Sequence, residues 1–273
     1  MNQPVATQAP LRHRRDIQGL RALAVISVVA YHAGTPHLDG GFVGVDLFFV
    51  ISGFLITSLL IAELGRNGRV SLGDFWARRA RRILPASTLV LVATAIAVAV
   101  VTPALERPDV SKDMTWAALF SANWRFAQQS TDYLATDRVT SPVLHYWSLG
   151  VEEQFYVFWP LIVVAVVLLV RGRRRMLALG GVTTVIVIAS LWWCIVETGA
   201  NQPYAFFGTP ARAWQLGLGC LLAIAAPWVA RLARTPANLL ALAGVAGLAW
   251  SMVSLKEAGG ATPIPVSLPC CPR

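Results

Sequence analysis

Arg21 and His32 are the first residues whose types and spacing indicate chemistry, because they lie eleven positions apart in an otherwise apolar stretch. If this stretch is a helix, eleven steps of about 100° return to within roughly 20° of the same direction. The two side chains would then share one helix face, about 16 Å apart along the axis. A guanidinium binds phosphate groups, and an imidazole acts as a general base near neutral pH. The spacing therefore predicts an anion-binding level and a proton-accepting level on one helix, although a lone histidine there would be interpreted as an interfacial side chain.

Carboxylates in apolar surroundings form a second group of candidates. Asp46 lies within the segment GGFVGVDLFFVISGF and, if it is buried there, it needs a partner, for which His32 and Arg212 are the candidates. The alternative is an interfacial carboxylate in contact with water. Glu152 and Glu153 are neighbours about 100° apart on a helix, so one is expected to line a cavity, and we favour Glu153. An outer layer of polar groups contains His32, Asp46, His145, Glu152, Glu153 and Arg212, and the five of them on helices, at similar depth, suggest one cavity.

Arginines cluster again in FWARRARRILP, residues 75–85. Arg79 and Arg82 are three positions apart, so they share a face if the helix starts early enough to include them. A phosphate-bearing donor on the cytoplasmic side would explain this pair. Charge that only anchors the chain at the membrane surface is the alternative, and it is the favoured interpretation for Arg78 and Arg81.

Membrane-spanning helices are the elements expected to position these residues. The chain of 273 residues is 56% hydrophobic and 14% charged, whereas about a quarter of a soluble chain is charged. Seven runs approach the roughly 20 apolar residues that cross a bilayer, at residues 17–33, 42–62, 83–102, 147–170, 177–196, 206–226 and 237–255. Lipid cannot hydrogen-bond the backbone, so the runs must be helical. The predicted fold class is an all-α polytopic transmembrane helix bundle.

The distribution of arginine predicts the orientation of this bundle. The net charge of +9 lies mostly in the N-terminal tail and in alternate loops, which indicates cytoplasmic anchoring and no nucleic-acid partner. The N-terminus is then cytoplasmic, and the first apolar run is an uncleaved helix. The longest outer loop, residues 103–145, is expected to be functional or disordered. The four cysteines have no metal-ligand spacing, so no metal is expected.

Four segments together resemble the acyltransferase-3 family of bacterial integral-membrane acyltransferases. They are DIQGLRALAVISVVAYH (16–32), GGFVGVDLFFVISGF (40–54), FWARRARRILP (75–85) and HYWSLGVEEQFYVFWP (145–160). Arg21 and His32 match the family's Arg-ten-His pattern, and Arg79 and Arg82 match its Arg-x-x-Arg pattern. A weaker fifth match is PARAWQLGLG (210–219), and the five segments follow the family's order.

The resemblance implies an O-acyltransferase of the bacterial cytoplasmic membrane. Its donor would be cytoplasmic acyl-CoA, in particular acetyl-CoA, and its acceptor a hydroxyl of a glycan or of another cell-envelope or secondary-metabolite molecule. His32 would be catalytic, with Arg21, Arg79 and Arg82 toward the donor. Asp46 would orient or stabilise the histidine. Direct attack by the acceptor is favoured over a covalent intermediate on Ser52, for which the sequence indicates no neighbouring base.

The end of the chain departs from the family pattern. The family has about ten spans, whereas ATPIP (261–265) is followed here only by VSLPCCPR. The expected organisation is a cytoplasmic tail at 1–16, an incomplete transmembrane acyltransferase domain at 17–256 and an atypical tail at 257–273. A secondary transporter is the main alternative and predicts an inverted repeat, which the sequence does not display. A seven-helix receptor would need an outer N-terminus, and its Schiff-base lysine would have to be Lys256.

Overall fold

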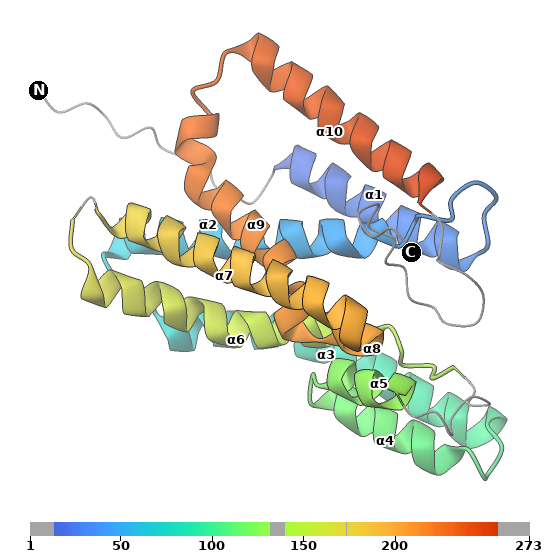
Figure 1. The fold of residues 1–273 in the computed structure, drawn as a ribbon. Coiled ribbons are helices and arrows are strands. Elements are labelled where there is room, and N and C mark those ends of the chain that lie inside the picture. The colour runs from blue at the N-terminus through green and yellow to red at the C-terminus, as the bar shows by residue number, and fades with distance from the viewer. Residues whose placement is uncertain (1–13, 132–139, 173, 256–273) are drawn as a thin grey trace, which may run out of the picture.

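The computed structural model describes residues 14–131, 140–172 and 174–255. Ten helices and no strand occur within these ranges, as Figure 1 shows, so the predicted all-α fold is confirmed. The predicted C-terminal tail and most of the N-terminal tail lie outside the described residues, as do Lys256, Cys270 and Cys271.

Five helices are long and apolar enough to cross a membrane. They are α2 (Val43–Asn67), α3 (Leu72–Val101), α6 (Tyr146–Leu169), α7 (Arg174–Ala200) and α10 (Arg234–Ser254). The other two predicted spans are helical as well, as α1 (Arg15–His32) and α9 (Thr209–Val229). These two fall short of the same standard of length and composition. Polar residues explain this, since the 18 residues of α1 include Arg15, Asp16 and Arg21, while Arg212 and Gln215 interrupt α9.

The predicted start of the third span was wrong by eleven residues, because α3 begins at Leu72 and not at Ile83. Ser71 caps its N-terminus, where the side-chain oxygen accepts the N–H of Asp74 at 3.4 Å. The cap lies before the apolar run, so apolar length alone did not predict it. The early start places Arg79 and Arg82 on the helix, as their proposed shared role requires.

Helices α2 and α9 form the centre of the bundle and approach each other through glycine. A Cβ atom at Gly53 would overlap the carbonyl oxygen of Leu216, and one at Gly219 would overlap the carbonyl oxygen of Val50. Small residues of this kind let helix backbones meet closely in membrane proteins. Helix α7 packs against α9, and α1 packs against α2. Asp46 on α2 is thereby held beside Arg212 on α9.

Two helices occupy the segment predicted as a long outer loop, namely α4 (Arg107–Ala118) and α5 (Ala122–Thr131). They lie at one end of the bundle, where α5 contacts the short α8 (Gln202–Phe207) (Figure 1). A buried amide network holds them there. Gln154 on α6 donates to the side-chain oxygen of Asn123 at 2.9 Å, and Asn123 donates to the side-chain oxygen of Thr209 at 3.1 Å. Polar side chains on three elements therefore satisfy one another.

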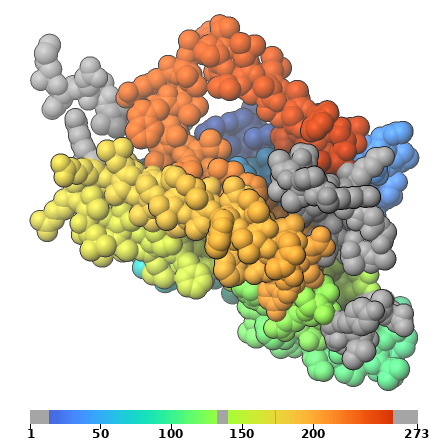
Figure 2. All heavy atoms as spheres, viewed as in Figure 1, coloured from blue at the N-terminus to red at the C-terminus, as the bar shows by residue number. Residues whose placement is uncertain are grey.

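Helix α10 is the least integrated part of the described chain. Only 6% of its most apolar window is buried, and Figure 2 shows an opening between α10 and α1. One hydrogen bond ties its C-terminal end to the bundle, from the N–H of Gly40 to the carbonyl oxygen of Met252 at 3.0 Å. The exposed leucine and valine side chains of α10 are suited to contact with lipid.

Candidate functional site

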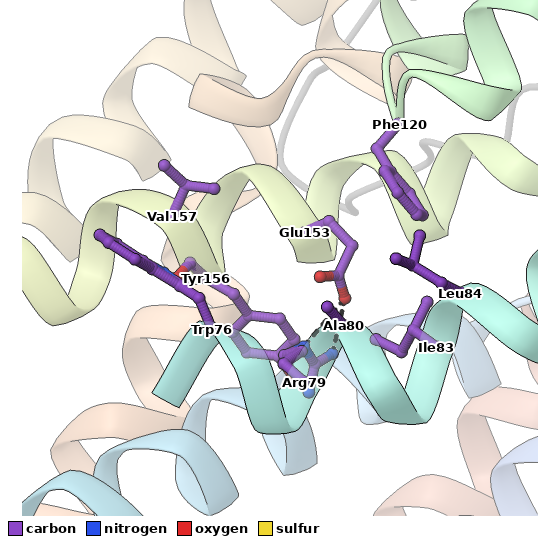
Figure 3. A pocket seen from close by; sticks show the side chains of 9 residues that line it. All are labelled: Trp76, Arg79, Ala80, Ile83, Leu84, Phe120, Glu153, Tyr156 and Val157. Carbon is purple, nitrogen blue, oxygen red and sulfur yellow. Dashed lines mark hydrogen bonds and ion pairs between the residues drawn. The ribbon is translucent and has the colours of Figure 1, made fainter. Parts of the chain in front are cut away.

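The first polar cluster centres on Arg79, which α3 directs at α6. Its Nε and Nη2 atoms donate to the same carboxylate oxygen of Glu153, at 2.9 and 2.8 Å (Figure 3). The guanidinium carbon lies 3.4 Å from the ring centroid of Tyr156, in a cation–π arrangement. The structure therefore joins Glu153 to the arginine layer, and not to the layer of His32 with which the sequence grouped it.

Two further hydrogen bonds hold α3 and α6 in this register. The indole N–H of Trp76 donates to the carbonyl oxygen of Tyr156 at 3.1 Å. Nearer the other end, the hydroxyl of Tyr146 donates to the carbonyl oxygen of Ser87 at 2.9 Å. Because both bonds use backbone acceptors, they position one helix against the other independently of the ion pair between Arg79 and Glu153.

A cavity of about 200 Å³ lies beside this ion pair. Most of its lining is apolar, and α3, α6 and the turn between α4 and α5 all contribute. In Figure 3, Trp76 and Val157 lie at one end, Leu84 and Phe120 at the other, and the charged pair between them. The lining residues are Trp76, Arg79, Ala80, Ile83, Leu84, Phe120, Glu153, Tyr156 and Val157. The cavity can hold an apolar group while a guanidinium borders it.

Glu152 faces Ser52 and not the cavity beside Arg79. The hydroxyl of Ser52 donates to Oε1 of Glu152, and the hydroxyl of Tyr156 donates to the same oxygen at 3.3 Å. The other oxygen of Glu152 lies 4.0 Å from Nη2 of Arg79. The expectation that Ser52 has no neighbouring base was therefore wrong. The two residues are 100 positions apart, so only the packing of α2 on α6 reveals the contact.

The second polar cluster centres on Asp46. Its Oδ1 atom accepts from Nη1 of Arg212 at 3.2 Å and from Nε2 of Gln215 at 2.8 Å. Of the two partners predicted for this carboxylate, the structure shows Arg212. Gln215 was not predicted, although its position three residues after Arg212 puts both on one face of α9. Arg212 also donates from Nε to the carbonyl oxygen of Phe206 at 2.7 Å, which fixes the guanidinium plane.

His32 ends α1 with its Nδ1 atom 2.8 Å from the carbonyl oxygen of Val28. A carbonyl can only accept, so this contact assigns the proton to Nδ1 and leaves Nε2 as an acceptor. His32 and Asp46 line one cavity of about 120 Å³ with a largely aromatic wall. The full lining is Tyr31, His32, Phe42, Val45, Asp46, Leu144, Trp147, Phe206, Phe207 and Arg212.

The single outer cavity predicted from the sequence was therefore wrong, because its members divide between two sites. His32, Asp46 and Arg212 share one cavity, while Glu153 lines the other. Of the predicted donor-side arginines, Arg79 lines a cavity, Arg82 is exposed on α3 and Arg21 is half-buried on α1. Glu153 lines a separate cavity because α3 starts early and brings Arg79 beside α6.

Five candidate membrane spans and two polar pockets between helices define a multi-pass helical membrane protein. The chain belongs to the acyltransferase-3 family, whose model, described as "Acyltransferase domain", matches residues 14–263. The family resemblance expected from the five segments is thus confirmed, and the description of the family model is that of an acyltransferase domain.

Several curated proteins are similar to the chain. A putative peptidoglycan O-acetyltransferase, YrhL of Bacillus subtilis, is 36% identical over 216 residues, which cover 79% of this chain and 34% of that protein. The peptidoglycan O-acetyltransferase OatA of Listeria monocytogenes is 35% identical over 237 residues, covering 85% and 37%. The O-acetyltransferase OatA of Staphylococcus aureus is 35% identical over 216 residues, covering 79% and 35%. The chain thus spans about a third of the length of these relatives, and no solved structure matches it.

Proposed function

We propose that this chain is the membrane-embedded part of an O-acyltransferase that moves an acetyl group from cytoplasmic acetyl-CoA to a hydroxyl of a cell-envelope glycan. The names of its relatives suggest peptidoglycan as the acceptor. We place it in the bacterial cytoplasmic membrane with its N-terminus inside, as the arginine distribution indicates. The observation that carries the proposal is the geometry of His32, whose Nε2 is left to accept a proton at an aromatic cavity.

The cavity of His32 suits a sugar acceptor. Tyr31, Phe42 and Trp147 offer apolar ring surface, against which the C–H faces of a sugar pack. Asp46 offers carboxylate oxygen to sugar hydroxyls at the same cavity, and its side chain is 37% exposed. Sites with mostly apolar walls and a few convergent polar groups are typical of small-molecule recognition.

The cavity of Arg79 suits the thioester end of the donor. At about 200 Å³ it is smaller than the roughly 300–1,000 Å³ of pockets that enclose drug-sized ligands, so the nucleotide part of coenzyme A lies outside it. We assign the phosphates of that part to exposed Arg82 and to Arg21, because guanidinium groups bind phosphate in a bidentate manner. Arg79 keeps N–H donors beyond the two that Glu153 accepts, so it can also face the thioester carbonyl.

The proposed reaction is a direct transfer. Nε2 of His32 takes the proton of the acceptor hydroxyl while the hydroxyl oxygen attacks the thioester carbonyl of acetyl-CoA. The carbon–sulfur bond breaks, the ester forms, and the imidazolium of His32 gives its proton back to the leaving thiolate, so that coenzyme A departs as the thiol. Asp46 and Ser52 are six residues apart on α2, about 9 Å along its axis. The flexible pantetheine arm of the donor spans such a distance, which favours attack without a carrier residue.

Isotope-labelled donor tests the proposal on the purified chain in detergent. We expect ¹³C-acetyl-CoA and soluble muropeptides to yield muropeptides with one added acetyl group, detected by mass spectrometry. Mild alkali should remove the label, because an ester is cleaved under conditions that leave an N-acetyl group intact. Consumption of acetyl-CoA without any labelled glycan, or labelling that resists alkali, would refute O-acetyl transfer to this acceptor.

A further inference from the structure

Phe120 joins α4 to α5 with a backbone φ of 52°, in the left-handed region. A bulky aromatic residue is rare there, and the conformation is strained for a residue other than glycine. The surroundings hold it in place. Its carbonyl oxygen accepts from Nε2 of Gln154 at 2.9 Å, and a Cβ atom at Gly150 would come within 3.0 Å of the same oxygen. The turn is therefore fixed against α6 despite its strain.

The ring of Phe120 lies in the cavity of Arg79, which is otherwise built from α3 and α6. Figure 3 shows it pointing toward Leu84, at the opposite end of the cavity from Trp76. Arg79 and Glu153 lie between these ends. The strained backbone between α4 and α5 thus places one aromatic ring in the wall of the candidate donor site.

We propose that Phe120 determines the length of the acyl chain that the enzyme accepts, an inference that rests on the donor site assigned under the proposed function. With the thioester carbonyl facing Arg79, the acyl chain extends along Ile83 and Leu84 toward the Phe120 ring. The ring borders that end of a cavity of only about 200 Å³. An acetyl group fits in front of it, whereas further methylene groups meet the ring. Overfilling a packed apolar wall forces side chains out of their preferred rotamers, which disfavours longer chains.

The substitution Phe120→Gly separates the ring from the backbone that carries it. Glycine adopts a φ of 52° without strain, so the turn and its hydrogen bond to Gln154 are retained while the ring is removed. Phe158→Ala is the matched control, because Phe158 lies on α6 near the cavity but is 62% exposed on the outer surface. Both variants lose an aromatic ring, and only the first enlarges the cavity.

Isothermal titration of the full chain in detergent with acetyl-, butyryl- and hexanoyl-CoA tests the inference, with free CoA as the reference. In the parent we expect acetyl-CoA to bind most tightly. In Phe120→Gly we expect hexanoyl-CoA to bind at least about tenfold more tightly than in the parent, since each methylene in an apolar pocket is worth about 10–200-fold. Acetyl-CoA should change by less than about threefold, and Phe158→Ala should keep the parent profile.

Two results would overturn the inference, and they are distinguishable. If acetyl-CoA binds but Phe120→Gly leaves the chain-length profile unchanged, Phe120 does not measure the acyl chain, and the donor site stands. If the acyl group adds nothing to the affinity of free CoA in any variant, the donor assignment fails and the inference fails with it. Size-exclusion profiles matching the parent show that each variant is folded.

Discussion

The two polar clusters are each centred on an arginine that contacts a carboxylate, yet they differ in which partner is exposed. At the first, the side chain of Arg79 is 21% exposed and that of Glu153 is 16% exposed. At the second, Arg212 is only 10% exposed and Asp46 is 37% exposed. The first pair therefore presents its cation as well as its carboxylate, and the second mainly its carboxylate. The same residue types thus present different groups to the two cavities, depending on which partner the packing covers, and the proposed donor and acceptor sites differ in this way.

His32→Gln is expected to have the largest effect, because it removes the base from the acceptor cavity. A side-chain amide can still donate to the carbonyl oxygen of Val28, but it cannot take up a proton at neutral pH. We expect transfer of labelled acetyl to fall by about 10²–10⁴-fold. The Kd for acetyl-CoA should not change, since the donor cavity lies elsewhere. A folded His32→Gln protein with full transfer would remove the distinction between the two sites.

Arg79→Ala is expected to weaken acetyl-CoA binding by about 10–100-fold, through loss of charge-assisted hydrogen bonds at the donor cavity. It should also lower the melting temperature, because Glu153 is left buried without its partner. Adding Glu153→Gln should restore the melting temperature but not the affinity, which separates binding from folding. Arg82→Ala is the control on the same helix and should weaken binding less, in a salt-dependent manner. Equal losses for the two arginines would show that Arg79 has no special position.

Asp46→Asn is expected to reduce transfer about tenfold without changing the Kd for acetyl-CoA. The amide keeps the shape of the carboxylate but removes its negative charge. That charge faces Arg212, and the same carboxylate oxygen accepts a hydrogen bond from Gln215. Asp39→Asn, on the exposed loop between α1 and α2, provides the control. A parallel loss of acetyl-CoA affinity would mean that the two cavities are coupled more closely than their separate linings indicate.

Ser52→Ala is expected to have the smallest effect. It removes one hydrogen bond to Glu152, which contributes about 1 kcal/mol, so a small decrease in melting temperature should accompany near-normal transfer. Loss of transfer together with an acyl adduct on Ser52 in the parent, found by mass spectrometry, would instead make this serine an acyl carrier. That result would mean that the acyl group passes between the two cavities by way of Ser52 on α2.

Apolar length and composition predicted the seven long apolar helices, because these are local properties, but they did not predict α4 and α5. They also indicated that Asp46 needs a partner and left His32 and Arg212 as candidates, of which the structure shows Arg212. They did not predict that Glu152 and Glu153 turn toward Ser52 and Arg79. That outcome depends on the register of α6 against α2 and α3, which backbone hydrogen bonds such as that of Trp76 help to determine. Phe120 was missed as well, because a left-handed φ at a phenylalanine leaves no trace in composition.

The glycine contact between α2 and α9 also limits how the protein can move. The Leu216 carbonyl occupies the space of a side chain at Gly53, and the Val50 carbonyl does so at Gly219. Interlocked backbones of this kind resist sliding of one helix along the other. Rigid-body rocking that moves α2 against α9, as one route to alternating access, would have to shear this joint. A reaction across this bundle is therefore better served by a mobile substrate arm between two stationary pockets.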